Sequence, residues 1–295
     1  MAELVVAAVQ MRSGVMPEAN IQSMDALVRE AASRGARYVQ TPEMTGAVQK
    51  DRKGLRSVLK SEADDAVLKA AASLASELGI YLHIGSTAID VGQEMTANRG
   101  VVFGPDGDLL ARYDKIHMFD VDLDNGESWR ESAVYQPGEI ARTVDLDGAR
   151  LGMGICYDIR FPHLFRDLAL AGADILTAPA AFTRQTGEAH WHVLQRARAI
   201  ENGAFVISAA QGGVHEDGRE PYGHSLIVDP WGRVIAEAKG DEPGVIVASL
   251  ALDEVKAARG KVPNLKNARS YRIESGLQQA SGQTKTEKET GESVA

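Results

Sequence analysis

The segment Ala171-Gly172-Ala173-Asp174-Ile175-Leu176-Thr177-Ala178-Pro179 repeats the pattern of an earlier one, Arg34-Gly35-Ala36-Arg37-Tyr38-Val39-Gln40-Thr41-Pro42. Each has a Gly-Ala step typical of a helix end, then a short strand-like run and a proline. Residues 101–111 and 226–236 form a second pair, with a Pro-x-Gly turn between two apolar runs. The order strand, helix, strand, helix, strand, hairpin therefore occurs twice. It predicts two similar layered halves facing each other across one core; chance recurrence of common α/β units is the alternative.

Short apolar runs alternate with longer amphipathic stretches, which indicates an α/β protein. We expect strands at residues 4–11, 38–42, 81–86, 151–156, 175–178 and 205–210. We expect helices at about 17–33, 64–78, 162–171 and 189–202. One folded domain is expected over residues 1–275. Residues 276–295 have almost nothing to bury and are expected to form a disordered tail.

The composition, with 44% hydrophobic and 25% charged residues, is typical of a globular protein. The formal net charge of −9 has the wrong sign for a nonspecific phosphate binder, so no nucleic-acid partner is expected. No segment approaches the apolar length of a membrane span, so no membrane partner is expected either. Because the single cysteine cannot form an internal disulfide, we expect a cytoplasmic location.

That cysteine, Cys156, lies where the apolar run 151–155 gives way to a turn. Side chains at strand ends are held rigidly and often face a cleft, which favours a nucleophile. Free cysteine is also among the most buried residue types, so a packing role stays open. A redox sensor is disfavoured because the chain has no second cysteine to resolve an oxidised thiol.

A thiol nucleophile needs a base, and the seven histidines do not by their number identify one. Glu43 follows the proline that ends the predicted strand 38–42, whereas the matching position in the second half is Ala180. The fold therefore does not itself require an acid there, and Glu43 is a candidate base. Lys115 lies among aromatic and apolar neighbours; it is either a buried oxyanion donor or a surface lysine.

The segments Thr41-Pro42-Glu43-Met44, Tyr113-Asp114-Lys115-Ile116-His117 and Gly154-Ile155-Cys156-Tyr157-Asp158-Ile159-Arg160-Phe161-Pro162 resemble the nitrilase, or carbon-nitrogen hydrolase, superfamily in order and spacing. The similarity runs from Leu4 to about Tyr271. Residues 186–201 and 222–232 are similar to its Nit branch, which contains deaminated glutathione amidases and ω-amidases. One departure is His192, where a glutamate is often found. The resemblance implies an α/β fold, a four-layer αββα sandwich of two pseudo-symmetric halves, in agreement with the repeat.

The resemblance also implies a catalytic set. Glu43 would take the thiol proton, Cys156 would attack the amide carbon, and Lys115 with the backbone N–H of Tyr157 would hold the oxyanion. A second glutamate commonly lines such sites. Glu131 matches it best and Glu127 is the runner-up, a solvated loop acid being the alternative for Glu131.

In the Nit branch, the positions matching Arg160, Phe182 and Thr186 are associated with the carboxylate end of the substrate; Tyr157 is a further substrate-binding candidate. Arginine suits a carboxylate because its planar fork can donate two hydrogen bonds. Arg160 could instead pair with Asp158 and brace the loop.

No metal and no cofactor are expected. His190 and His192 are close in sequence, but residues two apart on a helix face different directions, so packing or helix-surface roles are favoured over ligation.

The expected function is hydrolysis of a small linear, carboxylate-bearing amide through a cysteine thioester, with release of ammonia. Deaminated glutathione is the first candidate substrate. The alternatives are an ω-amidase acting on 2-oxoglutaramate, an N-carbamoyl amino acid hydrolase, a nitrilase, or a non-catalytic scaffold on the same fold. A homodimer or higher homo-oligomer is expected, and the proline-containing segment Lys261–Arg269 could cross to a partner, or fold back on its own subunit.

Overall fold

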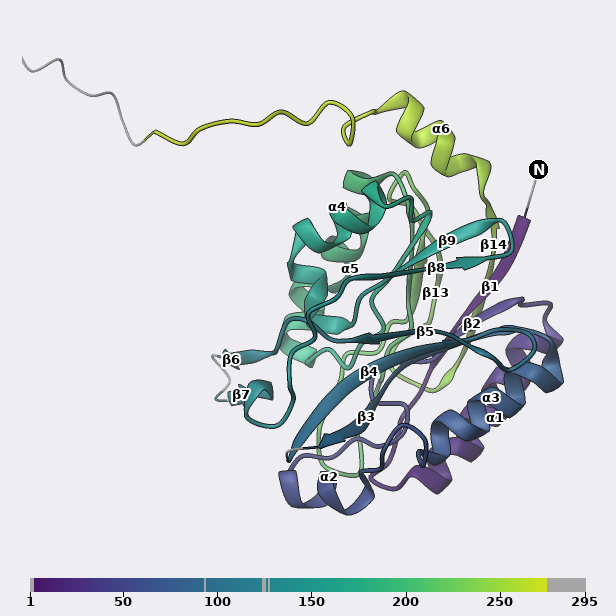
Figure 1. Cartoon of the computed structure of the whole chain (residues 1–295), viewed down its shortest axis with the longest axis vertical. Helices are drawn as coiled ribbons and strands as arrows, with labels where there is room; N and C mark the ends of the chain where they lie inside the picture. Colours follow the sequence, from purple (N-terminus) through teal and green to yellow (C-terminus); the bar gives the residue numbers. More distant parts are fainter. Residues whose placement is uncertain (1–2, 93, 124–125, 127, 275–295) are drawn as a thin grey trace, which may run out of the picture.

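Two six-stranded sheets lie face to face between two layers of helices in the computed structural model (Figure 1), which describes residues 3–92, 94–123, 126 and 128–274. The first sheet has the order β14 (Gly244–Ala251), β1 (Glu3–Gln10), β2 (Tyr38–Gln40), β3 (Tyr81–Gly92), β4 (Met95–Phe103), β5 (Leu109–Asp114). The second has the order β8 (Arg142–Leu146), β9 (Ala149–Met153), β10 (Ile175–Thr177), β11 (Phe205–Ser208), β12 (Leu226–Val228), β13 (Val234–Glu237). The expected tail lies outside the described residues.

The predicted repeat is confirmed by the pairing within the sheets. Strands β1, β2 and β3 run parallel and lead into the β4–β5 part of the sheet, as β9, β10 and β11 lead into β12 and β13. Each sheet also has one antiparallel strand beside its first parallel strand, β14 beside β1 and β8 beside β9. The two halves therefore share one topology, which is the predicted αββα sandwich.

The helices cover the outer faces of the two sheets. Helices α1 (Pro17–Ser33) and α3 (Ala66–Leu78) pack on the first sheet, and α4 (Pro162–Leu170) and α5 (Arg184–Asn202) pack on the second (Figure 1). Each has an apolar face that would otherwise be exposed to water. Two further helices, α2 (Arg52–Val58) and α6 (Asp253–Lys261), lie at the periphery. Among the described residues no helix combines the length and apolarity required to cross a membrane.

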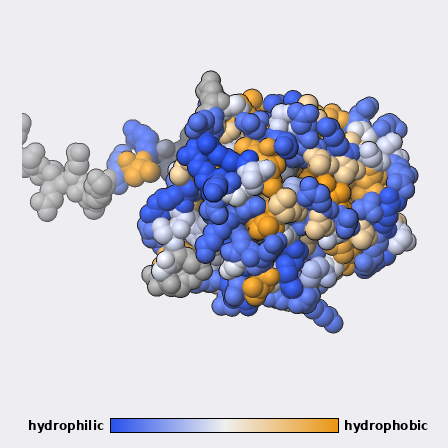
Figure 2. Space-filling view, turned by 90° about the horizontal axis from the view of Figure 1, so that it is seen from below, coloured by the Kyte–Doolittle hydropathy of each residue, from blue (hydrophilic) through white to orange (hydrophobic). Residues whose placement is uncertain are grey.

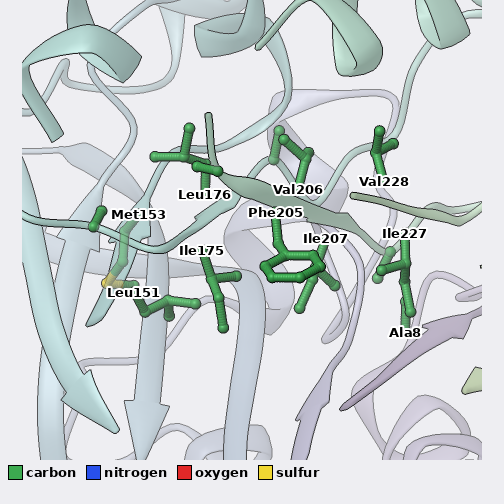
Figure 3. Close-up of a cluster of buried hydrophobic side chains, with 14 of the residues drawn as sticks. Ala8, Leu151, Met153, Ile175, Leu176, Phe205, Val206, Ile207, Ile227 and Val228 are labelled. Atoms are coloured by element: carbon green, nitrogen blue, oxygen red, sulfur yellow. The ribbon is translucent and has the colours of Figure 1, made fainter. Parts of the chain in front are cut away.

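Side chains of the second sheet alternate between its two faces, as strand geometry requires. Figure 3 shows Leu176, Val206 and Val228 on one face and Ile175 and Phe205 on the other. All are buried, and one contiguous apolar cluster extends from the first sheet through the second to its helices. This packing holds the carboxyl ends of β2 and β9 at fixed positions.

Two buried glutamines connect the sheets by directional hydrogen bonds. Gln40 Oε1 accepts from the backbone N–H of Ala209 at 2.8 Å, and Gln10 Oε1 accepts from that of Ser225 at 2.8 Å. Because a buried amide without partners would be costly, these bonds fix the lateral alignment of the two halves.

Several predicted boundaries were wrong. Helix α5 begins at Arg184, five residues before the expected start, because the polar segment 184–188 already forms its first turns. Four strands end earlier than expected. Those expected to end at residues 42, 156 and 210 end at Gln40, Met153 and Ser208, and the one expected to end at residue 178 ends at Thr177. At three of these ends, those of β2, β9 and β10, the residues that follow contribute to the candidate site. Strand β3, by contrast, continues to Gly92.

Candidate active site

Cys156 lies just beyond β9, at the start of a 3-10 helix, Cys156–Arg160. It is 7% exposed, and its backbone N–H donates to the carbonyl of Pro179 at 2.9 Å. Its φ of +48° lies in the left-handed region, which L-residues other than glycine seldom adopt. Such conformations persist where surrounding structure enforces them, and they cluster at functional sites.

Glu43 and Lys115 form a buried ion pair beside this thiol. Lys115 Nζ donates to Glu43 Oε1 at 2.9 Å, and the two side chains are 2% and 5% exposed. Glu43 Oε2 accepts from the backbone N–H of Ala181 at 2.8 Å. The Glu43 carboxylate is near enough to the Cys156 thiol to raise the pKa of that thiol, and Lys115 acts on it in the opposite direction. The alternative of a surface position for Lys115 is therefore wrong.

Glu131 completes the cluster from the short 3-10 helix Glu131–Ala133, which follows the hairpin of β6 (Asp120–Asp122) and β7 (Ser128–Arg130). Its two carboxylate oxygens accept from Lys115 Nζ at 3.0 and 2.9 Å, and Oε2 also accepts from the backbone N–H of Phe119 at 2.7 Å. It is therefore not a solvated loop acid. The runner-up, Glu127, lies outside the described residues.

Asn98, which the sequence analysis missed, joins the two carboxylates. Its Nδ2 on β4 donates to Glu43 Oε1 at 2.9 Å and to Glu131 Oε1 at 3.2 Å. The sequence carries no clear signal for it, because Asn98 stands in β4 beside the polar Thr96 and Arg99; only the structure shows that its amide is buried and needs partners.

The charges of the cluster are set by burial and by the contact of opposite charges. Burial opposes the ionisation of Glu43, but the charge and hydrogen bond of Lys115 outweigh it and hold the pKa of Glu43 below its ordinary value. Burial likewise opposes charge on Lys115, but Glu131 and Glu43 raise its pKa well above the ordinary value. Burial and the Glu43 carboxylate raise the pKa of the Cys156 thiol. At neutral pH the site therefore holds a neutral thiol beside an ionised carboxylate and an ammonium.

Asp158 braces the loop that carries Cys156, without help from Arg160. Its carboxylate accepts from Tyr113 Oη at 2.7 Å, from the backbone N–H of Ile155 at 2.9 Å and from that of His117 at 3.0 Å. Among the described residues no ion pair joins Arg160 to Asp158, so that alternative was wrong. The reason is that Asp158 is fully buried and already has its partners.

Arg160 instead extends along the second half of the molecule. Its guanidinium lies 5.2 Å from the centre of the Phe182 ring and 3.3 Å from His190 Nδ1. Burial lowers the pKa of Arg160 without the compensation that a carboxylate partner would give. The guanidinium is thus a half-buried cation able to accept an anionic group.

The remaining predicted substrate-binding residues lie close to these groups in the sequence or in space. Tyr157 is half-buried and packs edge-on against Phe119 at 5.0 Å between ring centres. Phe182 follows Ala181, whose N–H is bound by Glu43, and Thr186 is buried with its hydroxyl 2.8 Å from that of Thr183. The structure therefore brings the four predicted catalytic residues together and places Arg160 and Phe182 in contact.

Comparison with known proteins shows the family of the chain. Residues 5–260 match the carbon-nitrogen hydrolase family. Among curated relatives, a deaminated glutathione amidase from Yersinia enterocolitica is 36% identical, covering 90% of this chain and 92% of that protein. An omega-amidase from Homo sapiens is 34% identical, covering 91% of this chain and 96% of that protein.

Solved structures share the fold. The NitFhit protein of C. elegans has a TM-score of 0.84 and 32% identity over 91% of this chain, which spans 66% of the length of that protein. An amidase mutant from Nesterenkonia sp. AN1, with the acetamide moiety of fluoroacetamide covalently added at its active-site cysteine, has a TM-score of 0.77 and 26% identity, covering 90% of this chain and 94% of that one. The match over residues 5–260, at these levels of identity, shows that the chain belongs to the carbon-nitrogen hydrolase family.

Proposed function

We propose that this chain hydrolyses small linear amides by means of Cys156, Glu43 and Lys115, with Glu131 as the residue that positions Lys115. The observation that carries the proposal is the buried ion pair of Glu43 and Lys115, whose charges both act on the buried thiol of Cys156. Because the pKa of Glu43 lies below that of the thiol, Glu43 stays ionised at neutral pH and can accept the proton of the thiol. The covalent adduct at the active-site cysteine of the Nesterenkonia amidase supports the assignment of the nucleophile.

The geometry supports a two-stage reaction. Glu43 takes the proton of Cys156 as the sulfur attacks the amide carbon, and Lys115 stabilises the oxyanion together with the backbone N–H of Tyr157. Glu43 then gives the proton to the departing ammonia, which leaves a thioester. A water molecule, deprotonated by Glu43, attacks the thioester and releases the carboxylic acid and the free thiol.

A non-catalytic scaffold is the competing interpretation, and the energetics of the cluster argue against it. Lys115, Glu43 and Glu131 are at most 12% exposed, and such groups are costly to bury, whereas apolar residues of similar volume often stabilise a fold as well or better. A protein released from catalysis would gain by losing this cluster. The cluster is instead complete, with each carboxylate hydrogen-bonded by at least two groups.

For the substrate we propose an amide that carries a carboxylate, because Arg160 is a half-buried cation whose pKa burial lowers and which lacks an ion-pair partner among the described residues. Deaminated glutathione is the first candidate and 2-oxoglutaramate the second, in line with the names of the two relatives compared above. We further propose a cytoplasmic location, on the basis of the single unpaired thiol.

A substrate panel tests this proposal. Purified protein is expected to release ammonia from deaminated glutathione faster than from 2-oxoglutaramate, an N-carbamoyl amino acid or a nitrile. Changing Arg160 to methionine is expected to raise KM for both carboxylate substrates by about tenfold or more, since a charge-assisted contact contributes about 1.5–3 kcal/mol. The uncharged amide acetamide is the control, and its kcat/KM should be unaffected. An equal loss with acetamide would contradict the role of Arg160.

We also propose that the chain forms a homodimer through exposed apolar residues of α5 and the segment after α6. Val193 and Ile200 on α5 are 67% and 53% exposed, and Tyr271 and Ile273 are 84% and 89% exposed. Asn264 and Leu265 contact their own subunit, through Glu201 and Arg166, but the chain beyond them leads away from the body (Figure 1). Elsewhere, on the face in Figure 2, apolar groups are interspersed with hydrophilic ones. A second copy would cover the exposed residues.

Light scattering at micromolar concentration is expected to give twice the chain mass of 31.6 kDa. Changing Val193 to glutamate should shift the mass toward that of the single chain, because a charge would be buried without a partner. Leu110, which is 43% exposed on β5, gives a control, and its change to glutamate should leave the dimer intact. A wild-type mass of 31.6 kDa would show that pairing is not obligate.

A further inference from the structure

Three side chains from separate parts of the second half converge outside the catalytic cluster. His192 lies on α5, His224 precedes β12, and Glu237 is the last residue of β13. Glu237 Oε1 is 2.8 Å from His192 Nε2 and 2.9 Å from His224 Nδ1. The three potential ligand atoms all lie within 4.8 Å of one another. We propose that these residues bind a divalent transition-metal ion of the zinc class.

The ligand chemistry supports this class of metal. Two imidazole nitrogens and one carboxylate form a ligand set that zinc uses in proteins, and imidazole suits zinc, copper and nickel whereas magnesium and calcium prefer oxygen ligands. The three side chains are 33%, 26% and 35% exposed, so an ion can enter and keep a water ligand. The nitrogens that lie at hydrogen-bond distance from Glu237 Oε1 are the same atoms that would ligate the ion, and an imidazole nitrogen binds a metal through its lone pair.

The two histidines are held in place by their surroundings. The backbone of His224 has a φ of +55°, its N–H donates to Gly240, and its carbonyl accepts from Trp191 Nε1 at 2.8 Å. Its ring stacks on Tyr222 with 4.3 Å between ring centres. His192 projects from the middle of the 19-residue helix α5. Because little reorganisation is needed before an ion binds, little affinity is lost to ordering.

This site differs from the pair considered in the sequence analysis. His190 and His192 do diverge on the helix, since His190 contacts Arg160 and His192 contacts Glu237. The partners of His192 come instead from residues 32 and 45 positions along the chain, which only the fold brings together. An ion there would connect α5 to the β12–β13 hairpin and stabilise that half of the molecule.

Calorimetric titration of the chelator-treated full chain with Zn²⁺ tests the proposal. The Cys156→Ser variant is used throughout, so that the buried thiol does not contribute. We expect one saturable site per chain and a rise in melting temperature with Zn²⁺, but no saturable site for Mg²⁺. Glu237→Gln and His224→Asn should each weaken Zn²⁺ binding by about tenfold or more. Asparagine is chosen at residue 224 because it tolerates positive φ.

Two further variants test whether His192 binds the metal or only stabilises the fold through Glu237, and whether Zn²⁺ binds to exposed histidines in general. In His192→Gln the amide can still donate to Glu237, so the metal-free melting temperature should be retained while the rise with Zn²⁺ is lost. His163, an exposed histidine elsewhere, is the control, and His163→Ala should bind Zn²⁺ like the parent. Absence of a saturable site in the parent would overturn the proposal. So would binding that all three site substitutions leave unchanged.

Discussion

Replacing Cys156 by serine is expected to abolish ammonia release while leaving the fold intact, with a loss in kcat on the order of 10⁴-fold or more. The reason lies in the acidity of the two nucleophiles. Glu43, whose pKa is held low by Lys115, can share the proton of a thiol in the transition state, but a serine hydroxyl is far less acidic and its alkoxide is much harder to form.

The measurement is single-turnover and steady-state ammonia release, with circular dichroism and melting temperature as the test of folding. Serine is nearly isosteric with cysteine and the site is polar, so the melting temperature should change little. Alanine at the same position is the matched control, since it removes the nucleophile altogether, and both variants should be equally inactive. Near-normal turnover by the serine variant would remove Cys156 from the mechanism.

Replacing Lys115 by methionine is expected to cost both activity and stability. Loss of one oxyanion donor commonly lowers the rate by ~10²–10³. In addition, Glu43 and Glu131, which share Lys115 and Asn98, lose their buried cation. Breaking a buried ion pair by removing one partner typically costs about 3–5 kcal/mol, because the remaining charge is uncompensated.

The stability of the Lys115→Met variant should change with pH in the direction opposite to that of the wild type. In the variant, Glu43 stays buried but loses the cation that lowers its pKa, so its folded-state pKa lies above that of the unfolded chain. The variant is then most stable at a pH below the carboxyl pKa of the unfolded chain. Its stability declines as the pH rises through the pKa of the carboxyl group in the folded state. In the wild type, Glu43 has a lowered pKa, so its contribution is present above the unfolded pKa and is lost as the pH falls. The difference in melting temperature should therefore be larger at pH 8 than at pH 5.

Glu43→Gln provides the matched contrast to Lys115→Met. It too should be inactive, because an amide cannot accept the thiol proton, but Lys115 and Glu131 remain as a balanced pair. Its melting temperature should stay near that of the wild type at both pH values. Equal destabilisation of the two variants, or full kcat in either, would contradict the roles assigned to these residues.

Local patterns predicted much of the fold because the same order of elements occurs twice along the chain, once in each half. The proline-terminated runs at 38–42 and 175–179 identified β2 and β10, and the Pro-x-Gly turns identified the two hairpins. Strand β14 was missed. Its run Val245-Ile246-Val247 has the β-branched residues typical of a strand, and its residues are mostly half-buried because it lies at the edge of the first sheet. The first turn of α5 was missed because polar residues there gave no periodic signal.

The catalytic cluster was predicted only in part, because some of its contacts depend on tertiary packing. Glu43 and Lys115 stand at strand ends in recognisable segments, but the hydrogen bonds of Asn98 to both glutamates depend on the approach of residues 33 and 55 positions apart. The convergence of His192 and His224 on Glu237 is likewise a product of tertiary packing. Spacing along the chain carries information about neighbours within one element, and neither contact lies within one element.

The left-handed backbone of Cys156 indicates what selection has favoured at this position. A residue with a Cβ held at such a φ costs roughly 1–2 kcal/mol, which glycine would avoid in exchange for about 0.5–1 kcal/mol of unfolded-chain entropy. The small side chain of cysteine buries little apolar surface in return. Drift toward stability alone would therefore tend to remove the thiol, and its presence in this conformation is what the proposed nucleophilic role predicts.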